Sequence, residues 1–294
     1  MTLAGEEVVK GDESARPSKN ENEKKRQRRE DLHDLLLHAA REVVQQEGIE
    51  TAPRNLTFKQ VFEHVESMTG RHVTNASVIG RIWENQADFQ ADVLVAIARD
   101  QERPEVDLTL QAVSAVLNEV DLTFVESRLY ALQELCRVGG AASSSAIARS
   151  PIWSLWISVL TIATTTSDLE QRKRIGAALA DGYETMTESW QGIYVWLLDF
   201  LGFQMREPMT THQFTVAVTA LNEGYSLREH VDGGIEQFFL PTGRNGEDQE
   251  WTLFGAGLEA LVHRFLEPDP RFTPPSQGTI GGTIEVIDDT EPVR

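Results

Sequence analysis

The chain contains 294 residues, of which 40% are hydrophobic and 25% are charged. This composition is typical of globular proteins, and the length corresponds to about two domains. The single cysteine, Cys136, cannot form an intramolecular disulfide, and the seven histidines are scattered along the chain. A disulfide scaffold and a Cys/His zinc module are therefore excluded, and we expect no cofactor.

Targeting and membrane-spanning signals are missing from the sequence. The first residues lack the basic, apolar and small-residue succession of a secretory signal. The most apolar run, Ile152 to Ala163, is much shorter than the roughly 20 residues that cross a bilayer. We therefore expect a cytoplasmic protein with no membrane partner.

The net charge of −19 is unevenly distributed. Residues 101–294 contain thirteen Lys and Arg against twenty-eight Asp and Glu, which leaves a net −15. Residues 24–100 are nearly neutral, and five of the six residues from Lys24 to Arg29 are cations. A strongly acidic protein ordinarily repels nucleic acid, but this local basic arm can attract phosphate.

Helical spacing of apolar residues dominates the first third of the chain. Residues 1–23 are polar and predict a disordered tail. From Asp31 onward, apolar residues three and four apart predict a helix that ends at Gly48. Three more helices are expected: one capped by Thr57 and ended by Met68–Gly70, one from Thr74 or Asn75 to about Trp83, and one over Asn85–Arg99.

A hinge is predicted at Gln101–Val106, which contains Pro104. The apolar spacing that follows is helical, with loops expected at Ser143–Ser145 and Asp232–Asp248. The expected helices are Leu108–Val120, Leu122–Cys136, Ser150–Thr165, Leu169–Thr187, Trp190–Met205, His212–Arg228 and Gln249–Leu266.

No strand-like alternation precedes the C-terminal tail, so the sequence predicts an all-α protein. We expect a DNA-binding domain at 24–100 and a larger helical domain at 101–266. Residues 267–294 predict a polar tail, although the run Thr279–Ile287 has some strand character.

The second and third predicted helices are joined by a tight, glycine-containing turn, and a basic arm precedes them. This order is typical of a helix-turn-helix module, in which the third helix enters the major groove and basic groups hold phosphates. The segments Leu36–Gly48, Thr57–Val61 and Trp83–Phe89 are similar to the first helix, the second-helix start and the aromatic-x-Asn-Lys-x-x-Leu junction of TetR-family transcriptional regulators. The resemblance covers roughly Arg28–Arg99.

This resemblance implies a three-helix DNA-binding head followed by a helical ligand-binding and dimerisation domain. It further implies a homodimer, most often a repressor, that binds a palindromic operator in double-stranded DNA and is released by a small-molecule effector. From the residues themselves, an effector here should be apolar or amphipathic.

Polar and basic residues of the head are the candidates for contacting DNA, because Asn, Ser and Arg can bond base edges and cations can hold phosphate. Gly80 stands where the family usually has a tyrosine, and Gln86 replaces a lysine. A register shifted by one residue would instead place Arg81 at the tyrosine position. The candidates are Lys24, Lys25, Arg26, Thr57, Lys59, Asn75, Ala76, Ser77, Gly80, Arg81 and Gln86.

Aromatic residues are concentrated in two helices of the second domain, where a ligand pocket between helices is expected. These rings are Trp153, Trp156, Trp190, Tyr194, Trp196 and Phe200. Polar groups that lie on helices rich in apolar residues are Arg128, Glu134, Asp199 and His212. The resemblance assigns dimerisation to the last two helices, through Val216, Leu221, Phe254, Leu258, Leu261 and Val262.

Enzymatic motifs are absent from the sequence. It contains no glycine-rich phosphate loop, no G-x-S-x-G elbow and no H-E-x-x-H pair. We therefore expect no catalytic activity. The alternative to a regulator is a helical module of the same fold that binds small molecules or proteins and has lost operator binding, which Gly80, Gln86 and the acidic charge favour.

Overall fold

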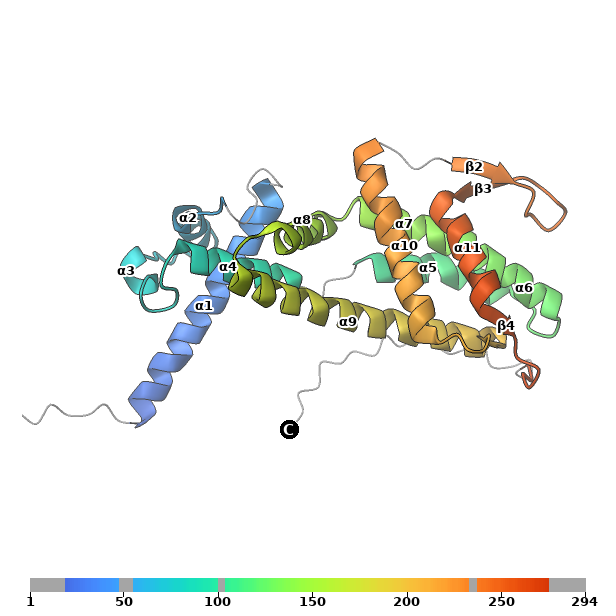
Figure 1. The fold of residues 1–294 in the computed structure, drawn as a ribbon, viewed down its shortest axis with the longest axis horizontal. Helices are drawn as coiled ribbons and strands as arrows, with labels where there is room; N and C mark the ends of the chain where they lie inside the picture. Colours follow the sequence, from blue (N-terminus) through green and yellow to red (C-terminus); the bar gives the residue numbers. More distant parts are fainter. Residues whose placement is uncertain (1–18, 48–54, 100–103, 233–236, 275–294) are drawn as a thin grey trace, which may run out of the picture. The chain divides into compact units, whose positions relative to one another are not determined.

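Helices account for most of the residues that the computed structural model describes, which are 19–47, 55–99, 104–232 and 237–274 (Figure 1). The chain divides into two units, Met1–Ala96 and Ile97–Arg294. The boundary falls inside a helix, a few residues before the expected domain boundary. Residues 101–103 of the predicted hinge and the strand-like run at 279–287 lie outside the described residues.

The first unit begins with a long helix, α1 (Lys19–Glu47). The expectation of a disordered tail through residue 23 and a helix start near Asp31 was therefore wrong for residues 19–30. Glu, Lys, Arg and Gln are good helix formers, and the segment contains neither proline nor glycine. The basic arm is consequently part of α1.

The expected second and fourth helices are confirmed as α2 (Phe58–Thr69) and α4 (Gln86–Ala98). Thr57 caps α2 in a reciprocal capping box with Gln60, whose backbone amide donates to the threonine hydroxyl at 3.3 Å. The side chain of Asn85 accepts from the backbone amide of Asp88 at 3.0 Å and so fixes the start of α4.

The third helix, α3 (Asn75–Val78), is much shorter than expected. It was predicted to reach Trp83, but Ile79 is already extended and Gly80 has φ of +71°. The amide of Gly80 donates to the carbonyl of Trp83 at 2.8 Å, which closes a turn in place of further helix. Glycine is the residue that adopts this left-handed conformation most readily and is among the poorest helix formers, so it ends α3 here.

The core of the first unit combines the buried face of α1 with aromatic rings from α2 and α4. Phe58 and Phe89 stack with centroids 4.7 Å apart, and Trp83 packs edge-on against Phe89 at 4.8 Å. The indole of Trp83 also stacks on His33 and donates to the carboxylate of Asp92. The fully buried aliphatic residues are Leu36, Val44, Leu56, Val61, Val65, Val78, Val93 and Leu94.

The second unit consists mainly of helices that pack on one another. Contacts join α5 to α7, α8 to α9, α9 to α10 and α10 to α11. Its helices are α5 (Pro104–Glu119), α6 (Val125–Glu134), η2 (Leu135–Gly139), α7 (Gly140–Ala148), α8 (Pro151–Thr165), α9 (Leu169–Leu201), α10 (Thr211–Asp232) and α11 (Leu253–Phe265).

Two of the expected helix boundaries in this unit were wrong. The predicted helices at 169–187 and 190–205 are joined in the single helix α9, because Glu188 and Ser189 do not interrupt it, and this helix ends already at Leu201. The predicted loop at Ser143–Ser145 is helical and belongs to α7. The π-helical turn η2 joins α6 to α7 without a loop, and a methyl group on Gly140 would lie 2.8 Å from the Cα of Gly255 on α11.

The described region is mostly helical, which agrees with the predicted all-α class, and it also contains four short strands. β1 (Phe203–Met205) pairs antiparallel with β4 (Leu266–Pro268), and β2 (Gln237–Leu240) pairs with β3 (Gln249–Thr252) as a hairpin. The hairpin occupies part of the predicted loop at 232–248 and the start of the predicted helix at 249–266. Thr252 caps α11, and its hydroxyl accepts from the amide of Gly255 at 3.0 Å.

Across the described ranges, no helix taken singly has the length and apolarity to cross a bilayer, and one pair bent by 70°, 125–148 with 152–165, meets those criteria only in combination.

Candidate functional site

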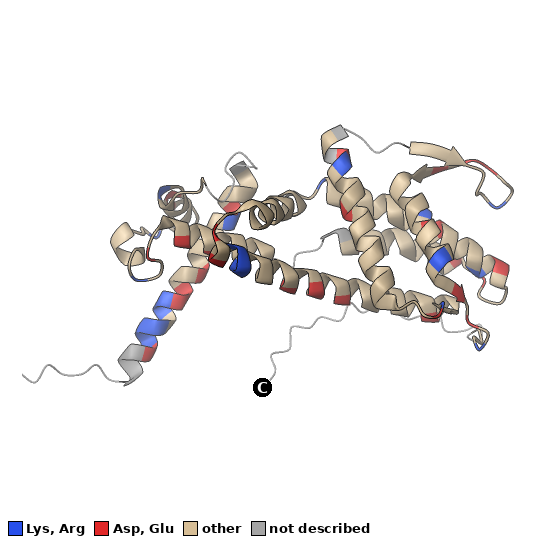
Figure 2. Cartoon of the chain, in the orientation of Figure 1, with Lys and Arg blue, Asp and Glu red and all other residues tan. Residues whose placement is uncertain are grey.

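The predicted DNA-contacting cations of α1 are exposed. Lys24, Lys25 and Arg26 carry no ion pair to another element in the described structure, and Arg26 lies 3.3 Å from Glu30 one helical turn away. Figure 2 shows this part of α1 as a stretch of ribbon in which blue basic residues alternate with red acidic ones. Such a helix can contact phosphates, and its own carboxylates reduce the attraction.

A groove of about 800 Å³ lies between α2, α3 and the turn that leads to α4. Four of the predicted DNA-contacting residues line it: Thr57, Lys59, Asn75 and Gln86. Three carboxylates, those of Glu63, Glu66 and Glu84, line the same groove. The acidic groups outnumber Lys59, so the groove itself does not favour phosphate.

Some of the residues predicted to contact DNA form hydrogen bonds within the head, and others lie outside the groove. The hydroxyl of Ser77 donates to the carbonyl of Thr74 at 2.6 Å, and the side chain of Gln86 donates to the carbonyl of Leu56 at 3.4 Å. Ala76, Gly80 and Arg81 are exposed beside the turn after α3. The predicted recognition helix is helical only over α3, which is its first turn.

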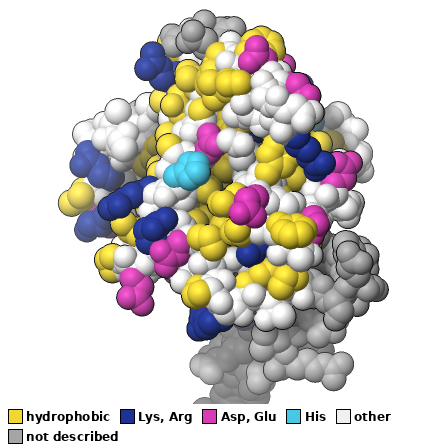
Figure 3. All heavy atoms as spheres, turned by 90° about the vertical axis from the view of Figure 1, so that its right-hand side faces the viewer, with side chains coloured by type: hydrophobic (Ala, Val, Ile, Leu, Met, Phe, Trp, Pro, Cys, Tyr) yellow, Lys and Arg dark blue, Asp and Glu magenta, His cyan; other side chains and the backbone are white. Residues whose placement is uncertain are grey.

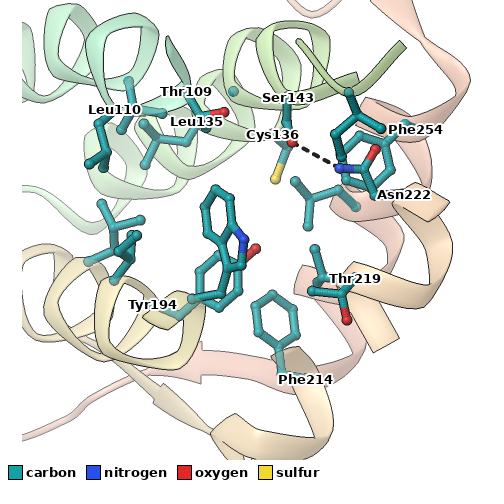
Figure 4. Close-up of a pocket in the computed structure, with 18 of the residues that line it drawn as sticks. Thr109, Leu110, Leu135, Cys136, Ser143, Tyr194, Phe214, Thr219, Asn222 and Phe254 are labelled. Carbon is teal, nitrogen blue, oxygen red and sulfur yellow. Dashed lines mark hydrogen bonds between the residues drawn. The ribbon is translucent and has the colours of Figure 1, made fainter. Parts of the chain in front are cut away.

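The second unit contains a cavity of about 140 Å³ among α5, η2 and the helices α7 to α11 (Figure 4). Four of the six rings predicted to bind a ligand line it: Trp153, Trp156, Trp190 and Tyr194. Trp196 and Phe200 lie outside the lining, where their rings stack on each other at 5.6 Å and Trp196 is exposed. Arg128, Glu134, Asp199 and His212 are outside it as well.

Two helices present a buried amide and a hydroxyl to the cavity. Asn222 on α10 is 7% exposed, and its side-chain Nδ2 donates to the hydroxyl of Ser143 on α7 at 2.9 Å. Figure 4 shows this pair at the cavity wall beside Phe254. The Oδ1 atom of Asn222 is buried and has no hydrogen-bond partner among the described residues. An unpartnered buried amide oxygen is unfavourable unless a ligand or water satisfies it.

Tyr194 on α9 and Cys136 on η2 also line the cavity, Cys136 beside Ser143 (Figure 4). Burial raises the pKa of the Tyr194 hydroxyl, and nearby Cys136 adds to the rise. Burial likewise raises the pKa of the Cys136 thiol, with a smaller contribution from Glu259. Both groups are therefore neutral at pH 7.

A hydrogen-bonded chain connects two of the lining residues, Trp156 and Glu223, through Tyr183. The indole of Trp156 donates to the hydroxyl of Tyr183 at 3.4 Å, and that hydroxyl donates to the carboxylate of Glu223 at 3.3 Å. Burial and the neighbouring Glu223 raise the pKa of Tyr183. None of the described residues that line the cavity is Lys, Arg or His, so these walls offer no cation to an anionic ligand. No group of His, Cys, Asp and Glu in the described ranges could hold a metal ion.

The residues predicted for dimerisation fall into two groups. Phe254 and Val262 are buried in the core of their own unit and line the cavity, as does Leu258, so the first two offer no surface to a second copy. Val216 is 45% exposed, and Leu221 and Leu261 are partly buried. The face seen in Figure 3 has apolar side chains interspersed with charges of both signs.

Sequence reasoning missed Asn222 and Ser143, and with them the polar part of the cavity. Ser143 was placed in a loop, and Asn222 was one polar residue in a predicted amphipathic helix. The aromatic clustering located the walls, because large rings in neighbouring helices tend to meet. No spacing pattern indicated which polar residue would face inward.

In comparisons with known proteins, no family model, no curated protein and no solved structure matches this chain.

Proposed function

We propose that the protein is a DNA-binding transcriptional regulator whose second unit binds a small-molecule effector. The observation that carries the effector site is the cavity of about 140 Å³, which has aromatic walls and the buried, unpartnered Oδ1 of Asn222. A mainly apolar cavity with few polar groups is the usual form of a small-molecule site. An apolar or amphipathic effector fits these walls.

Support for DNA binding comes from the first unit. The capped helix α2, the turn through Gly70 and the start of α3 follow the order of a helix-turn-helix module. The exposed cations of α1 and Arg81 supply groups that can hold phosphate. In this proposal a homodimer binds a palindromic operator, and the effector weakens that binding because it has a higher affinity for the DNA-free state.

Fluorescence anisotropy with the purified chain and DNA flanking its coding region tests the proposal. Binding should be selective for sequence and should weaken steeply as salt rises, because phosphate contacts release counterions. The triple variant Lys24→Ala, Lys25→Ala, Arg26→Ala and the single variant Arg81→Ala should each weaken binding. Lys173→Ala with Arg174→Ala, which removes two exposed cations from α9, is the matched control and should bind DNA like the parent.

Results of two kinds would contradict this proposal. Equal binding to random and flanking sequences would show that the flanking DNA contains no operator. If the Lys173→Ala, Arg174→Ala control bound DNA as weakly as the α1 variant, α1 would have no specific role in binding. A selection of bound fragments from the whole genome then decides whether an operator lies elsewhere.

A second candidate is a helical small-molecule-binding module without operator binding. The observations that favour it are the single turn of α3 and the acidic groove lined by Glu63, Glu66 and Glu84. A helix of one turn presents few side chains to base edges, and carboxylates repel phosphate. For this candidate, DNA binding at low salt should be weak and insensitive to the α1 substitutions, while ligand binding persists.

A further inference from the structure

Three properties of the cavity in the second unit restrict the ligand beyond its apolar character. These are its size, its charge and its unpartnered polar atom. We propose that it selects a neutral aromatic molecule of a single ring that bears a hydroxyl group, a simple phenol. This inference rests on the proposed function only in taking the cavity as the effector site.

The volume limits the ligand to about one ring. An apolar cavity of about 150 Å³ in another protein admits benzene, and the cavity here measures about 140 Å³. Several rings line it, among them Trp190, Tyr194, Phe214 and Phe254. Aromatic rings pack well against a further ring in offset or edge-on contacts. Larger polycyclic molecules would require the walls to move.

The lining excludes an anionic ligand at this site. Among the described residues around the cavity there is no Lys, Arg or His, and there is one carboxylate, Glu223. Transfer of a carboxylate ligand from water into such walls would cost several kcal/mol without a compensating cation. A benzoate should therefore bind much more weakly than a neutral ring of the same size.

The hydroxyl requirement follows from Asn222. Its Nδ2 is already bonded to Ser143, while its Oδ1 is buried and has no partner in the described structure. A ligand hydroxyl can donate a hydrogen bond to this oxygen, whereas a methyl group in the same place leaves it unsatisfied. Sites built to bond a hydroxyl reject the analogue that lacks it, because their polar group stays unpartnered.

Tyr194 offers a second neutral hydroxyl to the cavity. No hydrogen bond of its hydroxyl is formed within the described residues, and its ring packs edge-on against Phe214 at 5.2 Å. A phenolic group can donate or accept, so it can complete the contacts of a ligand hydroxyl or of a water beside it. Asn222 and Tyr194 come from the packed helices α10 and α9, and both line the cavity.

Isothermal titration calorimetry with the full chain at pH 7 tests the proposal with phenol, toluene and benzoate. Toluene matches phenol in shape and is the more hydrophobic of the two, so a purely apolar cavity prefers toluene. We expect phenol to bind about tenfold more tightly than toluene, and benzoate to show no binding. Equal or tighter binding of toluene would overturn the proposal, as would the absence of binding by phenol.

The variant Asn222→Leu keeps the size of the side chain and removes its amide. It should reverse the order of phenol and toluene, while Asn118→Leu, at an exposed position of α5, should leave the order unchanged. Tyr194→Phe provides a second variant if Asn222→Leu does not fold, and it should lower the affinity for phenol several-fold without changing that for toluene. An unchanged ratio in both variants would refute recognition by these groups.

The location of the ligand can be read from Cys136, the only cysteine and a lining residue. Saturating phenol should slow the modification of its thiol by a small methanethiosulfonate reagent at least fivefold, and unaltered modification would place the ligand elsewhere. DNA binding without phenol binding would overturn this inference alone. Phenol binding without DNA binding would support it and would overturn the operator part of the proposed function.

Discussion

The guanidinium of Arg128 caps the C-terminal end of α9 at Gly202. One nitrogen, Nη1, donates to the carbonyl of Leu201 at 2.9 Å and to that of Gly202 at 3.0 Å. The aromatic ring of Phe272 covers the same guanidinium at 4.5 Å. Carbonyls at a helix C-terminus lack partners within the helix and carry partial negative charge, so a buried cation is favourable there. This contact joins α6 to the end of the long helix that carries Trp190 and Tyr194.

Gly202→Ala should strongly destabilise the second unit. Gly202 has φ of +66°, and an added Cβ would lie 2.2 Å from the ring of Phe272 and 2.3 Å from Nη1 of Arg128. Backbone strain and overpacking together should lower the free energy of unfolding by roughly 2–4 kcal/mol. Urea denaturation followed by circular dichroism measures the change. Gly192→Ala, at an exposed helical position of α9 with open space around it, is the control and should be neutral or stabilising.

The substitution Gly80→Ala tests the length of α3. A one-turn α3 and an α3 that continues to Trp83 predict changes in stability of opposite sign. With φ of +71°, Gly80→Ala forces an unfavourable left-handed alanine and should destabilise the first unit by about 1 kcal/mol. If α3 continued to Trp83, the same substitution would stabilise it by a similar amount, since alanine is the better helix former. In a chain whose other tryptophans are replaced by Phe, the fluorescence of Trp83 reports on the thermal unfolding of this unit. A rise in the transition temperature would contradict the one-turn α3.

The thiol of Cys136 should react slowly at neutral pH. The thiolate is the reactive species, and burial raises the pKa of this group above its ordinary value, so the thiolate fraction is small. Alkylation by iodoacetamide should be far slower than for free cysteine at pH 7.5, and its rate should still be rising at pH 9, where the rate for free cysteine levels off. Mass spectrometry of the intact chain gives the rate. A plateau below pH 9 would show that the thiol ionises normally.

Helix positions were largely predictable from the sequence, and their ends less so. The capping residue Thr57 and the apolar spacing of α2 and α4 identified these helices, because both signals are local. The continuous run from α6 to α7 was not predictable, since Gly139 and Gly140 are typical of turns. The sequence did not predict that α9 is a single helix either. In the folded chain Gly140 can approach Gly255 closely because neither residue has a side chain. This contact depends on the tertiary structure and leaves no signal in the local sequence.

The candidate site was predictable in its apolar part only. Four of the predicted rings, on α8 and α9, line one cavity, because hydrophobic rings on neighbouring helices share a core. Trp196 follows Tyr194 by two residues, so it faces away from the cavity on a helix of 3.6 residues per turn. The partnership of Asn222 with Ser143 joins positions 79 residues apart and depends on how α10 packs on α7.

Alkaline pH should destabilise the second unit through the same neutral groups that line the cavity. The pKa values of Cys136 and Tyr194 are raised in the folded chain, so folding favours their protonated forms. The unfolded thiol and phenol ionise near their ordinary values of about 8.5 and 10, which means that stability is fully present below about pH 8.5 and falls above it. Between that pH and the raised folded pKa, Cys136 alone should contribute a loss of about 1.4 kcal/mol per pH unit.

Urea denaturation at pH 7.5, 9 and 10.5 measures this loss. Cys136→Ala should reduce the loss between pH 7.5 and 9, whereas Tyr194→Phe should reduce only the further loss towards pH 10.5, because the two groups ionise at different pH in the unfolded chain. The difference between the variants assigns each part of the curve to one side chain. A parent chain equally stable at pH 7.5 and 10.5 would mean that both groups ionise in the folded cavity as they do in water, which their buried positions do not allow.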